Sequence, residues 1–216
     1  RSGPARVSDV SRETFAVARR VFGDRFELAE QYAGLLATEG VERGLIGPRE
    51  TPRLWDRHLL NCAVFVSAIP DGVTVADVGS GAGLPGLVVA IARPDLKVTL
   101  IEPLLRRTSF LEEVVSALGL SNVEVLRGRA DEFHGKRTFD VVTSRAVAAL
   151  DKLAAWSLPL VKPGGVVLAM KGSSAPDEVA AHSLVVHSLG GQSLTVEKYG
   201  QDLLEQPTTI VRITTS

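Results

Sequence analysis

The 216-residue chain has very few of the residues that form disulfides and metal centres. Its single cysteine, Cys62, leaves no pair for a disulfide within this sequence and excludes a cysteine-rich metal site. The four histidines show no metal-ligand spacing, so we expect no metal site. They are His58, His134, His182 and His187. A lone thiol is typical of a reducing cytoplasm, which is the expected location.

Long apolar runs and an excess of basic residues are also missing. No segment approaches the roughly 20 apolar residues that cross a bilayer, so we expect no membrane contact. The formal net charge is −1, from 24 basic and 25 acidic residues. Proteins that bind nucleic-acid phosphates usually carry a basic excess, at least on one face. A nucleic-acid substrate would therefore have to bind through local clusters of cations.

The hydrophobic residues divide the chain into a helical first part and an alternating second part. Apolar residues recur at three- and four-residue spacings from about Ser11 to Gly44, which predicts helices. Thr51-Pro52 favours another helix start, with Thr as N-cap and Pro at the first position. We expect a helical extension over residues 1–70, packed on a domain formed by residues 71–216.

In the second part, apolar strand patterns alternate with amphipathic helix patterns. The expected strands cover residues 73–79, 97–102, 123–128, 139–146 and 165–172, and the helices cover 87–92, 105–119, 150–161 and 175–190. Residues 193–200 and 208–216 alternate with period two, as antiparallel strands do. The pattern predicts a Rossmann-like α/β fold, with a mostly parallel twisted sheet and a C-terminal antiparallel hairpin.

The segment DVGSGAGLPG, from Asp77 to Gly86, allows two interpretations. Reading from Gly81 gives G-x-G-x-x-G, the dinucleotide fingerprint. Reading from Asp77 gives D-x-G-x-G-x-G, the usual loop that holds S-adenosylmethionine. A carboxylate is repelled by a pyrophosphate but suits the ammonium and sulfonium of S-adenosylmethionine. Asp77 and the expected hairpin favour the second interpretation, with Gly79, Gly81 and Gly83 in the cofactor loop and Gly86 packing helix against sheet.

Polar residues follow the next strands at the edge where such sheets bind cofactors. Glu102 ends the second strand and can accept both ribose hydroxyls, which indicates a nucleoside without choosing between the two cofactors. After the third strand, Asp131 is placed to take an adenine amino group, with backbone contacts from Ala130. There is no N-P-P-Y motif after the fourth strand, and Cys62 lies outside any Pro-Cys loop. Methylation of an exocyclic amine and covalent attack on a pyrimidine are therefore not expected.

Basic residues gather at two places in the pattern. Arg53 and Arg57 lie one turn apart on the helix before the domain, where solvated charge explains part of the group. Four further cations fall at or just after strand ends, namely Arg127, Arg129, Arg145 and Lys171. Their convergence on one edge favours an anionic substrate. An ion pair of Arg145 with Asp140 or Asp151 is the alternative.

The chain resembles the bacterial ribosomal RNA small subunit methyltransferase G family, also called RsmG or GidB. The resemblance covers roughly Leu54 to the C-terminus and rests on WDRHLLN, DVGSGAGLPG, GRADEF, FDVVTSRA and MKG, in this order. It implies a methyltransferase fold and transfer of a methyl group from S-adenosylmethionine to N7 of a guanine in 16S rRNA. The partner would be 16S rRNA or the small ribosomal subunit.

The resemblance also implies roles for residues at matching positions. Cofactor contacts fall on Gly79, Leu84, Ala130, Asp131 and Arg145. Basic positions for substrate binding or turnover fall on Arg129, Arg145 and Lys171. The segment RGLIGPRET before Leu54 departs from the Trp-Asn and Asn-Leu-Thr of the family, so contacts made by those polar residues are not carried over.

The chemistry that the resemblance implies agrees with the residue inventory. Guanine N7 has a free lone pair and no proton to lose, so catalysis needs alignment rather than a general base. An arginine that bound both O6 and N7 would occupy this lone pair, so we expect the arginines to bind O6 or phosphates. The alternatives are a methyltransferase for a small molecule or another RNA, an NAD-dependent oxidoreductase, and a cofactor-sensing RNA-binding module without turnover.

Overall fold

A computed structural model describes residues 10–145 and 147–216. The described residues form one seven-stranded sheet in the order β3-β2-β1-β4-β5-β7-β6. The strands are β1 (Thr74–Val78), β2 (Lys97–Glu102), β3 (Val123–Arg127), β4 (Phe139–Arg145), β5 (Val161–Lys171), β6 (Ser193–Tyr199) and β7 (Thr208–Thr214). The first five run parallel, and β7 runs antiparallel to β5 and β6. This confirms the predicted sheet and its C-terminal hairpin. Residues 1–9 of the expected extension and Ala146, the expected end of the fourth strand, lie outside the described residues.

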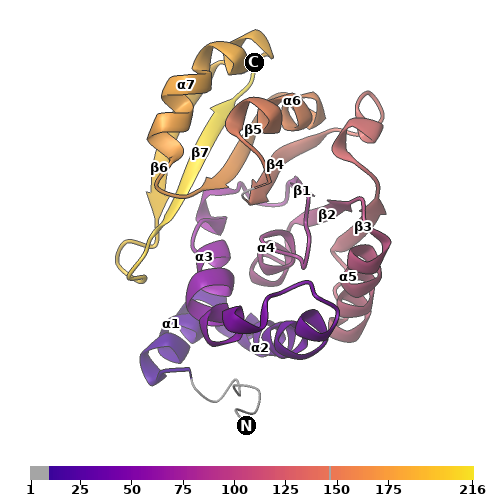
Figure 1. Cartoon of the computed structure of the whole chain (residues 1–216), viewed down its shortest axis with the longest axis vertical. Helices are drawn as coiled ribbons and strands as arrows, with labels where there is room; N and C mark the ends of the chain where they lie inside the picture. Colours follow the sequence, from indigo (N-terminus) through magenta and orange to yellow (C-terminus); the bar gives the residue numbers. More distant parts are fainter. Residues whose placement is uncertain (1–9, 146) are drawn as a thin grey trace.

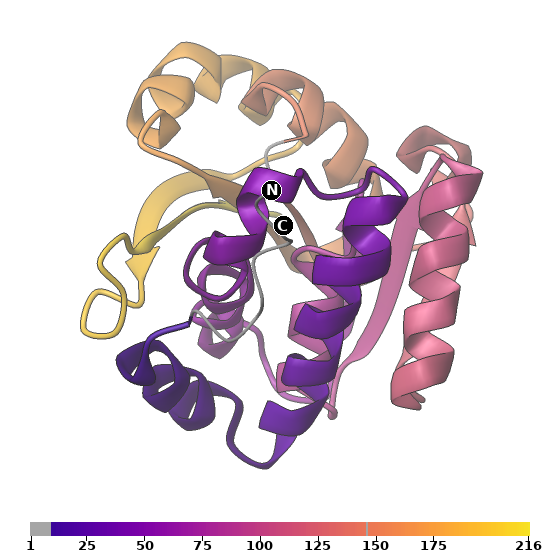
Figure 2. The ribbon, with the colours of Figure 1, turned by 60° about the horizontal axis from the view of Figure 1, so that its bottom comes forward.

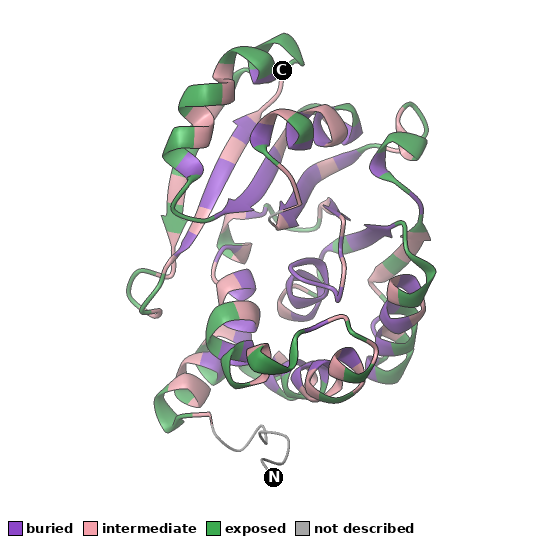
Figure 3. Ribbon diagram, viewed as in Figure 1, coloured by how far each residue is buried: buried purple, intermediate pink, exposed green. Residues whose placement is uncertain are grey.

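Helices cover both faces of the sheet (Figures 1 and 2). They are α1 (Arg12–Phe22), α2 (Phe26–Leu35), α3 (Leu60–Ala63), α4 (Gly86–Ala92), α5 (Leu105–Leu118), α6 (Leu150–Ser157) and α7 (Ala175–Ser188). Successive side chains of a strand point to opposite faces. Val75 and Val141 therefore pack with α4, α5 and the N-terminal helices, whereas Ala76 and Val142 pack with α6 and α7. Figure 3 shows the central strands buried between these layers.

The N-terminal helices pack directly on the sheet domain. Ser11 caps α1, because its Oγ accepts a hydrogen bond from Thr14 N at 3.1 Å. The Trp55 ring lies at the centre of an aromatic group, with ring centroids 5.7, 6.4 and 5.7 Å from those of Phe15, Phe22 and Phe26. Buried residues of α1 and α2 share one core cluster with those of α4 and α5. The extension thus packs against α4 and α5, on the side of the sheet that these two helices cover.

The predicted helix start at Thr51-Pro52 is wrong. A six-residue 3₁₀ turn already begins at Pro48, after Gly47 in an extended conformation, and Pro52 lies inside it. A π-helical turn over Leu54–Leu59 and then α3 follow. Proline at the first position needs no hydrogen-bonded N–H and has the φ angle of a helix. The earlier of the two prolines therefore starts the helical segment.

The predicted boundary between the helix over 150–161 and the strand over 165–172 is also wrong. The helix α6 ends at Ser157, a 3₁₀ turn follows, and β5 starts at Val161. Pro159 lies in that turn, and its ring and missing N–H interrupt an α-helix. The strand therefore begins four residues earlier than its apolar run suggests.

Candidate functional site

Two pockets open where the parallel strands end. The β1–β3 pocket has a volume of about 330 Å³ and is lined by Val78, Gly79, Ile101, Pro103, Gly128, Arg129, Ala130, Asp131, Val147 and Trp156. The β4–β7 pocket has a volume of about 700 Å³ and is lined by Arg57, Asn61, Arg145, Met170, Lys171, Gly172, Ser173, Pro176, Val196, Lys198, Glu205, Gln206, Pro207, Thr208 and Thr209. The first adjoins the ends of β1, β2 and β3, and the second adjoins the ends of β4 and β5.

The strand order reverses between these two pockets. From β1 the chain continues outward through β2 and β3, whereas β4 pairs with the other side of β1 and leads to β5. In open α/β sheets, ligands bind outside the carboxyl ends of the strands at such a reversal. The two pockets therefore occupy the two sides of the position at which this architecture binds its ligands.

The glycine loop after β1 has no room for a side chain at two of its three glycines. Gly79, Gly81 and Gly83 have φ angles of 70°, 58° and 101°, which side chains disfavour. A Cβ atom on Gly79 would lie 2.7 Å from Val147 Cγ1, and one on Gly83 would lie 2.4 Å from Leu87 Cδ1. Any larger residue at these two positions would displace its neighbours. The loop thus presents bare backbone at the edge of the β1–β3 pocket.

Asp77 lies fully buried beneath this loop. Its Oδ2 accepts hydrogen bonds from Ser80 Oγ and Gly86 N, both at 2.8 Å, while Oδ1 has no partner among the described residues. Burial raises the pKa of Asp77 to about 7, against the opposing effect of the two hydrogen bonds and of Arg145. A Cβ atom on Gly86 would lie 2.3 Å from Leu100 Cδ2. This confirms that Gly86 packs helix against sheet.

Tyr32, on α2, supports the same loop, a role that no sequence motif indicates. Its Oη donates a hydrogen bond to Ala82 O at 2.6 Å, and the side chain is fully buried. Burial raises its pKa well above the ordinary value, so the hydroxyl keeps its proton. A tyrosine on the apolar face of a helix needs a partner for its hydroxyl. That requirement was the only available signal, and it does not identify the partner.

Glu102 connects the loop to the end of β2. The side chain is buried; Oε1 accepts a hydrogen bond from Gly81 N at 3.1 Å, and Oε2 accepts one from Leu104 N at 2.8 Å. Arg107 Nη1 also lies 3.3 Å from Oε1. The carboxylate is thereby fixed at the strand end where the sequence predicted it.

Of the other predicted cofactor residues, three lie in the glycine loop or on the β1–β3 pocket, whereas Arg145 lines the β4–β7 pocket. Ala130 and Asp131 start a 3₁₀ turn after β3 and line the pocket, whereas Leu84 is buried within the glycine loop. Val147 and Trp156 also line the pocket, and no motif marks either of them. They come from the segment after β4 and from α6, which the chain fold brings to the ends of β1 and β2.

The four cations predicted to converge are divided between the two pockets. Arg129 lines the β1–β3 pocket, and Arg127 Nε donates to Pro103 O, at 3.4 Å, on the same side. Arg145 and Lys171 line the β4–β7 pocket. The reversal of strand order separates the end of β3 from the ends of β4 and β5, so the cations form two pairs.

Lys171 is less available than its position in the sequence implies. Its side chain is only 6% exposed, its Nζ donates to Ala148 O, and the same atom lies 3.1 Å from Glu178 Oε1. Glu178 also accepts a hydrogen bond from Leu150 N. Lys171 therefore joins β5 to α6 and α7 as well as bordering the pocket.

Arg145 has a partner that the sequence did not indicate. Its Nη1 lies 2.8 Å from His58 Nδ1. The expected alternative, an ion pair with Asp140 or Asp151, is not seen among the described residues: Asp140 accepts hydrogen bonds from Thr74, and Asp151 lies 4.0 Å from a histidine of α7. Arg145 thus connects the end of β4 to the N-terminal extension.

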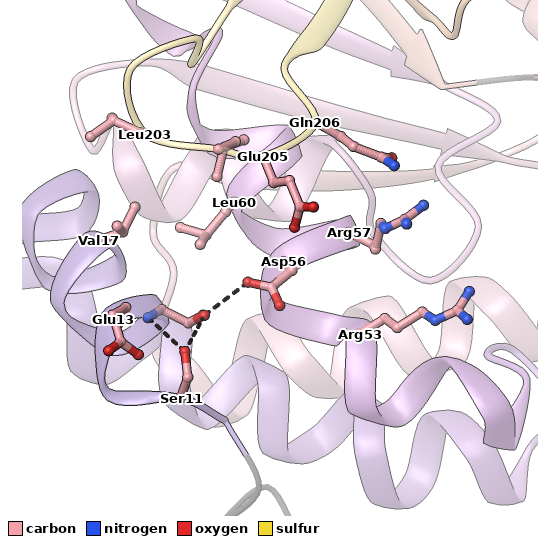
Figure 4. A pocket seen from close by; sticks show the side chains of 12 residues that line it. Ser11, Glu13, Val17, Arg53, Asp56, Arg57, Leu60, Leu203, Glu205 and Gln206 are labelled. Carbon is pink, nitrogen blue, oxygen red and sulfur yellow. Dashed lines mark hydrogen bonds between the residues drawn. The ribbon is translucent and has the colours of Figure 1, made fainter.

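Arg53 and Arg57 border a third cavity, the α1 pocket, of about 490 Å³ (Figure 4). It lies between α1, the segment before α3 and the loop that joins β6 to β7. Acidic residues share its lining, and Asp56 Oδ1 accepts a hydrogen bond from Thr14 at 3.0 Å. Arg57 also lines the β4–β7 pocket. The two arginines therefore border a cavity of mixed charge.

Neither a metal-binding group nor a membrane-spanning helix is found among residues 10–145 and 147–216. No group of three or more His, Cys, Asp or Glu side chains in this part of the chain is arranged to hold a metal ion. Over the same residues, no helix is long and apolar enough to cross a membrane.

Comparisons with known proteins agree with this architecture. A methyltransferase from Pyrococcus furiosus is similar with a TM-score of 0.57 and 17% identity, over 72% of this chain and 82% of that one. A SAM-dependent methyltransferase from Aquifex aeolicus is similar with a TM-score of 0.53 and 21% identity, over 68% and 85% of the two chains. At these identities the likeness concerns the fold alone, and it confirms the predicted methyltransferase fold.

Sequence comparisons reach further than the fold. The ribosomal RNA small subunit methyltransferase G of a Nocardioides species is 61% identical over 211 residues, which are 96% of this chain and 84% of that protein. The family model described as GidB, rRNA small subunit methyltransferase G, matches residues 25–207. The match includes the glycine loop, both pockets' strand ends and most of the N-terminal helices. The chain belongs to the rRNA small subunit methyltransferase G (GidB) family.

Proposed function

We propose that this protein is an enzyme that transfers a methyl group from S-adenosylmethionine to N7 of a guanine in 16S rRNA of the small ribosomal subunit. The observation that carries the proposal is the pair of pockets at the reversal of strand order, one beside a bare glycine loop and one bordered by cations. Membership of the GidB family supports the reaction. The proposed location is the cytoplasm, where bacterial ribosomes assemble.

The β1–β3 pocket fits the nucleoside of S-adenosylmethionine. Ile101, Ala130 and Trp156 offer apolar surface to a flat adenine ring. Asp131 is assigned to the adenine amino group, and Glu102 at the end of β2 is assigned to the ribose hydroxyls. These assignments follow the strand ends at which the side chains lie.

The glycine loop fits the remaining part of this cofactor. Gly79, Gly81 and Gly83 leave the backbone open to close approach, and Leu84 completes the loop. Below it, the unpartnered Oδ1 of Asp77 supplies a negative charge that a cationic ligand would stabilise. When bound, S-adenosylmethionine supplies a methyl group on a positively charged sulfur.

The β4–β7 pocket is assigned to the guanine and its flanking phosphates. Arg145 and Lys171 stand at its sheet edge, and Arg129 beside the other pocket is assigned to an RNA phosphate. Guanine N7 has no proton to lose, so the proposed acceptor needs no general base from the lining of this pocket. The role of the chain is then to align the reactants. Arg145 is assigned to O6 of the guanine or to a phosphate, because binding to N7 would block the attacking lone pair. The same arginine is also assigned to the cofactor.

The test is methylation of small ribosomal subunits from cells that lack this enzyme. The protein is incubated with these subunits and a radioactive methyl donor, and the labelled base is then mapped. We expect label on N7 of one guanine in 16S rRNA. Label at another atom, or label only in small molecules, would overturn the proposed reaction.

A binding measurement tests the cofactor separately from the acceptor. We expect saturable heat of binding for S-adenosylmethionine in calorimetric titration and none for NADH. Saturable binding of NADH alone would restore the dinucleotide interpretation of the glycine loop. If the protein binds both the methyl donor and RNA but transfers no label to RNA, it would instead be a cofactor-sensing RNA-binding module.

A further inference from the structure

A chain of three side chains joins the N-terminal extension to the β4–β7 pocket. Glu50 Oε2 lies 2.9 Å from His58 Nε2, and His58 Nδ1 lies 2.8 Å from Arg145 Nη1. Glu50 belongs to the 3₁₀ turn Pro48–Arg53, His58 to the π-helical turn Leu54–Leu59, and Arg145 ends β4. The proposed function uses only the last of these residues.

The geometry determines where the imidazole proton lies. An arginine only donates hydrogen bonds and keeps its charge, so His58 Nδ1 must be the acceptor for Arg145 Nη1. The proton of the neutral ring is then on Nε2, which donates to the Glu50 carboxylate. His58 is therefore neutral in this arrangement, and each of its nitrogens has a partner.

The charges that face His58 come from three elements. They are Glu50 on the 3₁₀ turn, Arg57 on the same π-helical turn as His58, and Arg145 on β4. Burial, Arg145 and Arg57 lower the pKa of His58, whereas Glu50 raises it. The hydrogen bond with His58 lowers the pKa of Glu50, so this group is a carboxylate near neutral pH. Burial raises the pKa values of Asp77, Tyr32 and Cys62, and the charge of Arg145 partly opposes this effect at each of them.

We propose that Glu50 and His58 are positioning residues that hold the Arg145 guanidinium at the β4–β7 pocket, and that protonation of His58 releases it. The inference rests on the proposed function. When His58 gains a proton, both ring nitrogens become donors and neither can accept from Arg145. Two cations then face each other at hydrogen-bonding distance and repel. Methyl transfer is expected to fall in acid while the fold remains intact.

The test is the pH profile of methyl transfer to small ribosomal subunits between about pH 5 and about pH 8. S-adenosylmethionine is kept saturating at every pH, so that protonation of Asp77 in the same range does not limit cofactor binding. The wild-type rate should fall about tenfold per pH unit on the acid side of the His58 pKa. In His58→Asn, the amide Oδ1 takes the position of Nδ1 and cannot titrate. This variant should keep the neutral-pH rate within about threefold and lose the acid decline. The control His182→Asn, on α7, should keep the wild-type profile.

A second variant keeps the inference testable if His58→Asn fails to fold. Glu50→Gln keeps an acceptor for Nε2–H but removes the charge that raises the His58 pKa, so its acid decline should move to lower pH. Histidine ¹⁵N spectra of the wild-type protein should show the His58 proton on Nε2. An unchanged acid decline in both variants, or a proton on Nδ1, would overturn the inference. If the wild-type protein methylates nothing at any pH, the proposed function is overturned instead. The histidine spectra would then still test the hydrogen-bonded arrangement of Glu50, His58 and Arg145.

Discussion

At the scale of single residues, the site is organised by how its charges are buried. Arg129 is exposed and Lys171 is paired with Glu178, but Asp77 is enclosed with one oxygen unpartnered. An enclosed carboxylate destabilises the free protein unless a cation compensates it. Asp77 is therefore the residue at which the stability of the free protein and the affinity for a cationic cofactor oppose each other.

The free energy of unfolding should depend on pH through Asp77. Its pKa is about 7 in the folded protein, against an ordinary value of 3.8. Between these values the unfolded chain binds fewer protons than the folded chain, so the contribution of Asp77 falls as the pH rises. Asp77→Asn cannot ionise, and its stability relative to wild type should increase from about pH 4 to about pH 7 in denaturant titrations. A constant difference would show that the carboxylate is not desolvated.

The same variant should bind S-adenosylmethionine less tightly. Asn keeps one oxygen for Ser80 Oγ and Gly86 N but brings no negative charge to the ammonium or sulfonium. Loss of a charge-assisted contact corresponds to about a tenfold or greater loss in affinity, measured by calorimetry. If the variant is more stable but binds S-adenosylmethionine with unchanged affinity, Asp77 acts only in the folding of the loop.

Arg145 should matter for transfer more than for stability. Arg145→Ala removes a cation from the β4–β7 pocket and leaves His58 Nδ1 without its donor. We expect the rate of methyl transfer to fall by about tenfold or more, measured as label in 16S rRNA. Arg127→Ala, which removes an exposed cation outside both pocket linings, is the matched control and should keep most of the rate. Intact cofactor binding together with intact transfer in Arg145→Ala would contradict the assignment.

At the scale of elements, the glycine loop depends on a helix that lies outside the sheet domain. The Tyr32 hydroxyl on α2 satisfies the carbonyl of Ala82, and a Cβ atom on Gly83 would lie only 2.7 Å from that hydroxyl. The loop conformation is thus fixed from one side by α2 and from the other by Asp77 and Glu102. The N-terminal helices therefore support the glycine loop as well as packing on α4 and α5.

Tyr32→Phe should therefore affect both stability and cofactor binding. The change leaves the buried Ala82 carbonyl without its hydrogen bond, at a cost of about 1–3 kcal/mol in the free energy of unfolding. Thermal unfolding with and without S-adenosylmethionine measures both effects. Tyr199→Phe removes a hydroxyl that bonds Glu197 far from the loop and should leave cofactor affinity unchanged. Equal affinities in the two variants would contradict the role of Tyr32.

Sequence patterns predicted elements better than they predicted contacts. Period-two and helical spacings located the strands and the order of helices, and Gly86 was correctly assigned to packing. The predicted element boundaries were wrong near Pro48 and Pro159, where a proline determines the start or the end of the neighbouring helical turn. The Tyr32–Ala82 and His58–Arg145 contacts join residues 50 and 87 positions apart. Such pairs depend on how helices settle on the sheet, which local spacing does not encode.

At the scale of the whole molecule, the helices over residues 10–70 and the described residues of the predicted domain over 71–216 share buried surface. One core cluster includes Leu36 and Phe65 from the first part and Leu87 and Phe110 from the second. The boundary at residue 70 thus marks a change of pattern in the sequence and does not separate two hydrophobic cores. Neither part encloses this cluster by itself.

We expect the two parts to unfold together. The chain has two tryptophans: Trp55 in the aromatic group of the extension and Trp156 on α6, across the sheet. Trp55→Phe and Trp156→Phe each leave one fluorescent reporter. After correction for the stability change of each variant, the fluorescence transition in urea should coincide with the circular dichroism transition. A reporter whose transition precedes the loss of secondary structure would reveal an extension that detaches first.

The pairing of β1 with β4 also determines which sequence changes this fold can accept without loss of its site geometry. Val75, Ala76 and Asp77 pair with Val141, Val142 and Thr143, so main-chain hydrogen bonds set the spacing of the two pockets. Side chains that line the acceptor pocket can be exchanged without moving this frame. An inserted residue inside β4 would instead turn Arg145 to the opposite face. Acceptor choice can therefore diversify by substitution, whereas the alignment of donor and acceptor is inherited with the backbone.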